Sequence, residues 1–125
     1  MKYIEIVNDA IQYIEFNLHC KLFLEELAFR YYISPMHFYR IFRAATNRTV
    51  KSYILGRKLS EAAIALRSTD RNITDIAFQY GFDSHEQFAR DFKKMFCATP
   101  SRYRKDNIQV PLMDRLDVVE RDYII

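Results

Sequence analysis

The sequence is poor in the residues that break or cross-link a chain. Its 125 residues include two Gly, three Pro, two Cys and no Trp. So few Gly and Pro argue against a turn-rich all-β domain and favour helices. Cys20 and Cys97 lie far apart and form no CxxC motif, which excludes a disulfide framework and is typical of free thiols in a reducing cytosol.

Long apolar runs are also absent. No run approaches the roughly 20 residues that a membrane span needs. The first turns of the chain carry Glu5, Asp9 and Glu15, so the N-terminus lacks the uninterrupted apolar core of a signal peptide. These absences predict a cytoplasmic protein without a membrane partner.

Catalytic patterns are missing as well. His19, His37 and His85 have no acid or nucleophile at a motif spacing, and no GxSxG, P-loop or dinucleotide glycine pattern occurs. His19 and Cys20 lack the other members of a metal-ligand set. We therefore expect no catalytic residues, no metal and no cofactor, and the protein is not predicted to be an enzyme.

What is present is a globular chain with uneven charge. Half of the residues are apolar and 28% are charged. Residues 1–105 hold 17 Lys and Arg against 11 Asp and Glu, a net charge of +6, whereas residues 106–125 carry a net charge of −3. A basic body with an acidic tail weakly favours a polyanionic partner.

Apolar residues recur at helical spacing almost throughout, so we predict an all-α fold of about seven helices. The first helix is predicted from an apolar face formed by Ile4, Val7, Ile11, Ile14 and Leu18. A longer helix is predicted from about Val50 to Leu66, although Gly56 inside it costs about 1 kcal/mol relative to Ala.

Local start and stop signals divide the remaining helices. Ser-Pro at 34–35 and Thr-Pro at 99–100 combine an N-cap hydroxyl with Pro at the first helical position. Residues 72–75 and 83–86 are capping-box patterns. Asn47 and Gly81 are suited to the left-handed conformation that ends a helix.

The most informative feature is an internal repeat. At an offset of 49, the matching positions are Leu27, Ala28, Phe29 and Tyr31 with Ile76, Ala77, Phe78 and Tyr80. After one inserted residue the offset becomes 50, and the matching positions are Ser34, Phe38, Arg40, Phe42, Arg43, Thr49 and Tyr53 with Ser84, Phe88, Arg90, Phe92, Lys93, Thr99 and Tyr103. A short helix, a tight turn and a second amphipathic helix therefore occur twice, as in two helix-turn-helix units.

In each unit the second helix turns its Phe residues inward, and the opposite face is polar. That face holds Met36, Arg40 and Arg43, flanked by His37 and Tyr39, in the first unit, and Glu86, Arg90 and Lys93, flanked by Gln87, Ala89 and Lys94, in the second. Arg side chains can form hydrogen bonds with guanine and Gln side chains with adenine. Lys or Arg near a helix end can bind phosphate.

Structural interpretations of the same residues stay open. A charged outer helix face is often only solvated. Glu86 either accepts from cytosine N4 or completes its capping box. Ser101, Arg102, Arg104 and Lys105 at the last helix, and Thr49 and Lys51 at the connecting helix, either offer a helix N-terminus to phosphate or serve as caps and solubilising charges.

The segment 73–104 resembles the signature of the AraC/XylS family of bacterial transcription regulators. The family pattern is I-x-x-I-A, then G-F-x-S, then F-x-R-x-F-K, then T-P-x-x-Y-R, and each element is present here. The first half also matches at Leu27-Ala28, Ser34, Phe38, Arg40, Phe42 and Tyr53-Ile54 leading to Arg57, so the resemblance covers about residues 4–105.

The resemblance implies a cytoplasmic, nucleoid-associated activator that binds promoter DNA without catalysis and contacts RNA polymerase. Two recognition helices would read adjacent major-groove segments of double-stranded DNA. The implied base-reading residues are Met36, Tyr39, Arg40, His85, Glu86, Gln87, Ala89 and Arg90. The phosphate-binding candidates are Ser34, His37, Arg43, Arg48, Thr49, Lys51, Lys93, Lys94, Ser101 and Arg102.

The sequence departs from the family pattern in the first unit. Tyr32 and Asn47 stand where Gly is frequent, and Phe23 stands where a hydroxyl cap is usual. Met36 and Ala89 offer no hydrogen bond, so contact with a thymine methyl is the most that they could add.

We expect a first helix-turn-helix subdomain at 1–49, a connecting helix at 50–67, a second subdomain at 68–106 and a tail at 107–125. The tail is either the entry to a further effector-binding domain that senses a small molecule, or a short helix or strand packed on the domain or on a second copy. The rival functions are a protein-interaction module and the DNA-binding fragment of a longer ligand-sensing regulator.

Overall fold

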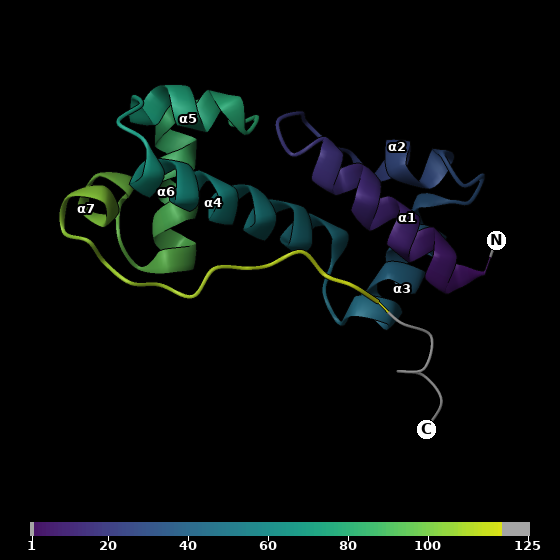
Figure 1. Ribbon diagram of the computed structural model, residues 1–125. Coiled ribbons are helices and arrows are strands. Elements are labelled where there is room, and N and C mark those ends of the chain that lie inside the picture. Colours follow the sequence, from purple (N-terminus) through teal and green to yellow (C-terminus); the bar gives the residue numbers. More distant parts are fainter. Residues whose placement is uncertain (1, 119–125) are drawn as a thin grey trace. The chain divides into compact units, whose positions relative to one another are not determined.

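A computed structural model describes residues 2–118, and this part of the chain contains seven helices and no strand (Figure 1). The helices are α1 (Tyr3–Phe16), α2 (Leu24–Phe29), α3 (Pro35–Thr46), α4 (Val50–Ser68), α5 (Ile73–Gln79), α6 (His85–Phe96) and α7 (Pro100–Lys105). The expected all-α fold with seven helices is confirmed. None of the described helices has the length and apolarity that a membrane crossing requires.

The chain forms two compact units whose boundary falls inside α4. Among the described residues, unit 1 comprises 2–55 together with 115–118, and unit 2 comprises 56–114. The C-terminal segment thus contributes to both units, and each unit is described by itself below.

Unit 1 packs α1, α2, α3 and the first turns of α4 around aromatic residues. Phe38, Phe42 and Tyr53 are fully buried, and their ring centroids follow one another at 6.1 and 5.9 Å. Beside them, Tyr31 donates a hydrogen bond of 2.6 Å to the Asp9 carboxylate. Burial, and then this hydrogen bond, raise the pKa of Tyr31 to about 12.

Unit 2 repeats this arrangement with more rings in contact. Phe92 on α6 is fully buried, and its ring lies 5.5 Å from Phe88, 4.7 Å from Phe96 and 5.4 Å from Tyr103 on α7. The inward Phe stripe expected from the repeat is therefore the core of each unit.

Four helices start at the caps that the sequence indicates, with one correction. The side chains of Ser34, Asn72 and Thr99 accept hydrogen bonds from the first turns of α3, α5 and α7. The cap of α6 is Ser84, whose Oγ accepts from Gln87 N at 3.1 Å, so the expected box at 83–86 is wrong by one residue. The Ser84 hydroxyl reaches the third helical amide in the same way as Ser34, its repeat equivalent.

Two backbone positions with positive φ recur in both units. Tyr32 (φ 57°) and Gly81 (φ 81°) occupy the same place in the two tight turns, and Asn47 (φ 59°) and Cys97 (φ 62°) end α3 and α6. The first turn thus keeps the geometry of the second although Tyr replaces Gly. Tyr32 is 92% exposed, so few contacts offset its strained backbone.

We expect Tyr32→Gly to stabilise unit 1 by about 1 kcal/mol, because Gly adopts the left-handed conformation without a Cβ clash. Chemical denaturation of both proteins measures the difference. Asn47→Gly, at the other left-handed position of unit 1, should show a smaller gain because Asn already tolerates this conformation. A destabilised Tyr32→Gly variant would mean that the Tyr side chain makes contacts worth more than the strain.

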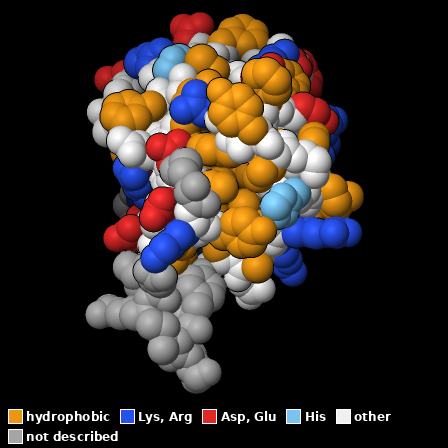
Figure 2. Space-filling model, turned by 90° about the vertical axis from the view of Figure 1, so that its right-hand side faces the viewer, with side chains coloured by type: hydrophobic (Ala, Val, Ile, Leu, Met, Phe, Trp, Pro, Cys, Tyr) orange, Lys and Arg blue, Asp and Glu red, His pale blue; other side chains and the backbone are white. Residues whose placement is uncertain are grey.

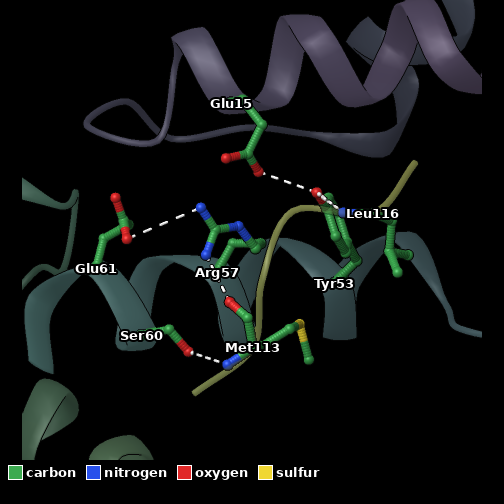
Figure 3. Close-up of polar contacts among 7 residues, drawn as sticks. All are labelled: Glu15, Tyr53, Arg57, Ser60, Glu61, Met113 and Leu116. Carbon is green, nitrogen blue, oxygen red and sulfur yellow. Dashed lines mark hydrogen bonds and ion pairs between the residues drawn. The ribbon is translucent and has the colours of Figure 1, made fainter. Parts of the chain in front are cut away.

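The C-terminal segment is neither a helix nor a strand over residues 108–118, so the alternative of a short helix or strand is wrong for these residues (Figure 1). Within unit 2, its backbone is held by side chains of α4. Met113 N donates to Ser60 Oγ at 2.8 Å, and Arg57 Nη1 donates to Met113 O (Figure 3). These side chains supply the backbone hydrogen bonds that a neighbouring strand would supply to an extended segment in a sheet.

Within unit 1, the same kind of contact continues. Leu116 N donates to Tyr53 Oη at 3.3 Å, and Tyr53 Oη donates to Glu15 at 3.0 Å (Figure 3). The Asn8 amide both donates to Val118 O at 2.7 Å and accepts from Val118 N at 3.2 Å. The described part of the segment therefore packs on its own chain, as the second alternative stated, but without the helix or strand of that alternative. The part of the tail expectation that concerns residues 119–125 lies outside the described residues.

Gly56 is explained by this packing. A Cβ at Gly56 would lie 2.5 Å from Met113 Cε and 2.7 Å from Met113 Sδ. Because Gly56 has no side chain, the Met113 thioether fits against α4. Gly lowers the stability of the helix by about 1 kcal/mol relative to Ala, and this contact explains why Gly is present.

A double-mutant cycle tests this coupling. We expect Gly56→Ala to gain about 1 kcal/mol of stability in a Met113→Ala background, because only the helix propensity then counts. In the natural background the gain should shrink or reverse, because the Met113 side chain must leave its place. Thermal or urea unfolding of the four proteins measures the interaction, and equal gains in both backgrounds would contradict it.

Candidate nucleic-acid interface

The outer face of α3 carries the first group of expected base-reading residues. Met36 is 58% exposed and Tyr39 is 37% exposed, and Arg40 is exposed beside them. They lie opposite Phe38 and Phe42, which are buried, so the amphipathic pattern of the helix fixes which side chains point outward. The structure therefore presents Arg40 on the surface of unit 1.

The outer face of α6 carries the second group. Glu86 and Arg90 are exposed, whereas His85, Gln87 and Ala89 are partly buried. Gln87 is bound to the start of its own helix, because its Oε1 accepts from Asp83 N at 3.3 Å and its backbone N donates to Ser84 Oγ. Arg90, at the repeat position of Arg40, is therefore the more accessible hydrogen-bond donor on this face.

The structure corrects the expected capping role of Glu86. The expected capping box would have tied its carboxylate to the start of α6. The cap uses Ser84 and Gln87 instead, and Glu86 lies exposed in the first turn of the helix. An acid in the first turn also favours the dipole of α6, so a contact of Glu86 with a base stays a prediction.

The cationic phosphate candidates all lie at the surface. They are Arg43, Arg48, Lys51, Lys93, Lys94 and Arg102. Two of them also have partners in their own chain. Arg43 Nη1 donates to Asn47 O at 2.8 Å, and Arg102 Nε lies 3.4 Å from Asp106 Oδ2. Both partners are themselves exposed, so these contacts cost little to exchange for a phosphate.

The polar candidates sit at helix starts. Ser34 Oγ accepts from His37 N at 3.1 Å, and Thr49 Oγ1 accepts from Ser52 N at 3.0 Å. Ser101 is exposed in the first turn of α7. Their hydroxyls thus cap helices or border them, which places any bound phosphate beside unpaired backbone N–H groups.

Arg104 has a structural role in place of the suggested phosphate contact. Its Nε donates to Leu66 O at 2.9 Å and its Nη2 donates to Thr69 O at 3.3 Å. These bonds fasten α7 to the C-terminal end of α4 within unit 2. The repeat gave no signal for this role, because the partners are backbone carbonyls.

Sequence reasoning also missed the surroundings of His37. Its Nε2 lies 3.1 Å from Tyr3 Oη, and the two rings meet edge to face at 5.3 Å. Tyr3 belongs to the first turn of α1, where nothing in the apolar stripe marks it as a neighbour of α3. Among the described residues, no group of three His, Cys, Asp or Glu is placed to hold a metal ion.

Comparisons with known proteins agree on the kind of domain. Residues 27–106 match a protein family described as a helix-turn-helix domain. The chain is 39% identical over 103 residues to the transposon Tn10 TetD protein of Escherichia coli, covering 82% of this chain and 75% of that protein. It is 36% identical over 104 residues to the regulatory protein SoxS of Escherichia coli K12, covering 83% and 97%.

A further relative is much longer than the match. The right origin-binding protein of Escherichia coli K12 is 42% identical over 100 residues, which cover 80% of this chain and 35% of that protein. The chain therefore spans about a third of the length of this relative.

Solved structures show the same fold. The C-terminal domain of AraT, a response regulator from Geobacillus stearothermophilus, superposes with a TM-score of 0.79 at 28% identity, covering 89% of this chain and 93% of that one. The DNA-binding domain of the transcriptional factor AdpA, solved in complex with a target DNA, has a TM-score of 0.71 at 26% identity, covering 83% and 90%.

Proposed function

The chain belongs to the AraC-type family of helix-turn-helix transcription regulators, which are DNA-binding proteins and not enzymes, and on this premise we propose that it activates transcription by reading promoter DNA through α3 and α6. The observation that carries the proposal is the repetition of one exposed basic pattern. Arg40 and Arg43 on α3 recur as Arg90 and Lys93 on α6, outside the buried Phe residues. A basic pair at the same two repeat positions supports a shared role of the two helices more than either helix does alone.

Base reading falls to the residues on the outer faces of the two helices. Arg40 and Arg90 each offer a bidentate fork to guanine O6 and N7 in the major groove. Glu86 offers an acceptor to cytosine N4, and Met36 and Ala89 offer apolar contact to a thymine methyl. Tyr39, His85 and Gln87 complete the set at the edges of these faces.

Phosphate binding is assigned to the residues that flank these two helix faces. The cations Arg43, Arg48, Lys51, Lys93, Lys94 and Arg102 supply affinity without reading sequence. Ser34, His37, Thr49 and Ser101 contribute hydrogen bonds at helix starts. The resulting partner is double-stranded promoter DNA, which would place the protein at the nucleoid of a bacterial cytoplasm. Contact with RNA polymerase is part of the same proposal.

The length of one relative supports a second candidate function for the whole protein. Since the right origin-binding protein continues well beyond the matched region, this chain is also suited to be the DNA-binding part of a longer regulator. A small-molecule effector site would then belong to the further domain.

Salt dependence tests the proposal directly. The six cationic candidates predict a slope of about −5 for log K against log salt concentration, because each neutralised phosphate contributes about −0.9. Binding to a random-sequence duplex should then weaken about a thousandfold between roughly 50 and 200 mM salt. Fluorescence anisotropy of a labelled duplex measures this.

The matched controls are single charge removals. Lys93→Gln should make the slope less steep by about 1, whereas Arg71→Gln, at an exposed cation outside the candidate set, should leave it unchanged. A chain that ignores DNA at every salt concentration would contradict the proposal and favour a protein-interaction module.

A further inference from the structure

A pocket of about 600 Å³ opens between the first turn of α1 and the side of α3 in unit 1. It is lined by Lys2, Tyr3, Ile4, His37, Arg40, Ile41, Ala44 and Ala45. The volume falls within the range of small-molecule sites in proteins, which are concave, largely apolar and fitted with a few polar groups.

The pocket combines an apolar floor with a cationic edge. Ile4, Ile41, Ala44 and Ala45 supply aliphatic carbon, whereas Lys2, His37 and Arg40 supply nitrogen. None of the described residues that line it is acidic. Figure 2 shows hydrophobic side chains gathered on one face of the molecule, with both basic and acidic side chains around them.

Two further features favour a negatively charged occupant. Tyr3 and Ile4, in the first turn of α1, line the pocket, and the N-cap residue Lys2 makes no side-chain cap hydrogen bond. The positive end of the helix dipole points the same way. His37 is held at this edge by Tyr3, with 3.1 Å between Nε2 and Oη.

We propose that this pocket binds a small organic anion with an apolar body, of the aryl-alkyl carboxylate class, and that Arg40 is shared between this ligand and DNA. The carboxylate would be bound by Arg40 and the amides of α1, and the apolar body would cover Ile41 and Ala44. A nucleic-acid backbone does not suit this floor, because it offers no apolar surface of that size. The shared use of Arg40 rests on the proposed function.

The ligand would therefore compete with DNA for Arg40. A ligand that draws the Arg40 guanidinium toward α1 removes the donor that α3 would offer to guanine. Bound anion therefore lowers affinity for DNA, and the DNA-binding domain would itself respond to a metabolite without a further domain.

The test uses 3-phenylpropanoate as the probe and 3-phenylpropanamide as its uncharged counterpart. Titration of the ¹⁵N-labelled chain should shift amides of α1 and α3 with a dissociation constant on the order of 1 mM, as expected for a ligand of this size. The amide should bind about tenfold more weakly, because it lacks the charge-assisted hydrogen bond. Inorganic phosphate should shift the same amides much less.

Variants separate the site from general charge attraction. Arg40→Gln removes the cation and Ala44→Leu fills the floor; both positions are exposed, and each change should weaken binding about tenfold. Arg71→Gln in unit 2 is the control and should bind as the natural chain does. Equal binding of acid and amide, equal shifts by phosphate, or an unchanged Ala44→Leu variant would overturn the pocket.

A second measurement tests the shared arginine. About 10 mM 3-phenylpropanoate should lower the affinity for a duplex carrying a selected binding site about tenfold, by mass action, with sodium acetate at equal ionic strength as the reference. A saturable titration with unchanged DNA affinity would overturn the competition. A chain that binds the probe but never binds DNA would instead contradict the proposed function.

Discussion

Arg40→Ala and Arg90→Ala should each weaken binding to the cognate DNA site by about 1–3 kcal/mol and change binding to random DNA much less. Each substitution removes a bidentate donor that distinguishes guanine from the other bases. Because both residues are exposed and opposite the core, the folded domain should be preserved. Competition titrations with specific and random duplexes measure the two affinities.

The control for this prediction is the neighbouring phosphate candidate in each helix. Arg43→Ala and Lys93→Ala should weaken specific and random binding by similar factors. If Arg40→Ala and Arg90→Ala also lost equally on both duplexes, these residues would touch phosphates only, and base reading would have to be assigned elsewhere on α3 and α6.

Phe92→Ala should destabilise unit 2 by about 3–5 kcal/mol, which is a large part of the stability of a small domain. The ring is fully buried and lies within 5.5 Å of Phe88, Phe96 and Tyr103, so truncation removes the centre of the aromatic cluster and leaves a cavity. Denaturant unfolding followed by circular dichroism measures the loss.

Phe78→Ala is the matched control within the same unit. Phe78 lies on α5 and is 53% exposed, so the substitution should change stability by no more than about 0.5 kcal/mol. A similar loss for Phe78 and Phe92 would mean that the cluster around Phe92 is not the core of unit 2.

The repeat made most of the fold predictable. The pairs Phe38 and Phe88, and Phe42 and Phe92, identified the buried faces of α3 and α6, and the cap residues Ser34 and Thr99 identified two helix starts. These signals are local, because they depend on spacing within one helix or on the residue that precedes it. The exposed faces followed from the same spacing.

Contacts between segments that lie far apart in the sequence could not be predicted from it. Nothing in the pattern of α1 marks Asn8 as the residue that binds the backbone of Val118, and Ser60 was indistinguishable from any other polar helical residue. Gly56 was the one available signal, since a helix interior favours Gly only where another group needs the space. The pocket beside Arg40 was missed for the same reason, because it depends on how α1 lies against α3.

Selection of binding sites from a random duplex pool at about 0.15 M salt tests the central claim most directly, because non-specific binding is weak there. If α3 and α6 both read bases, the selected sequences should contain two short conserved blocks about one helical turn apart. Arg40→Ala should remove one block and Arg90→Ala the other. No enrichment of any sequence would contradict the account.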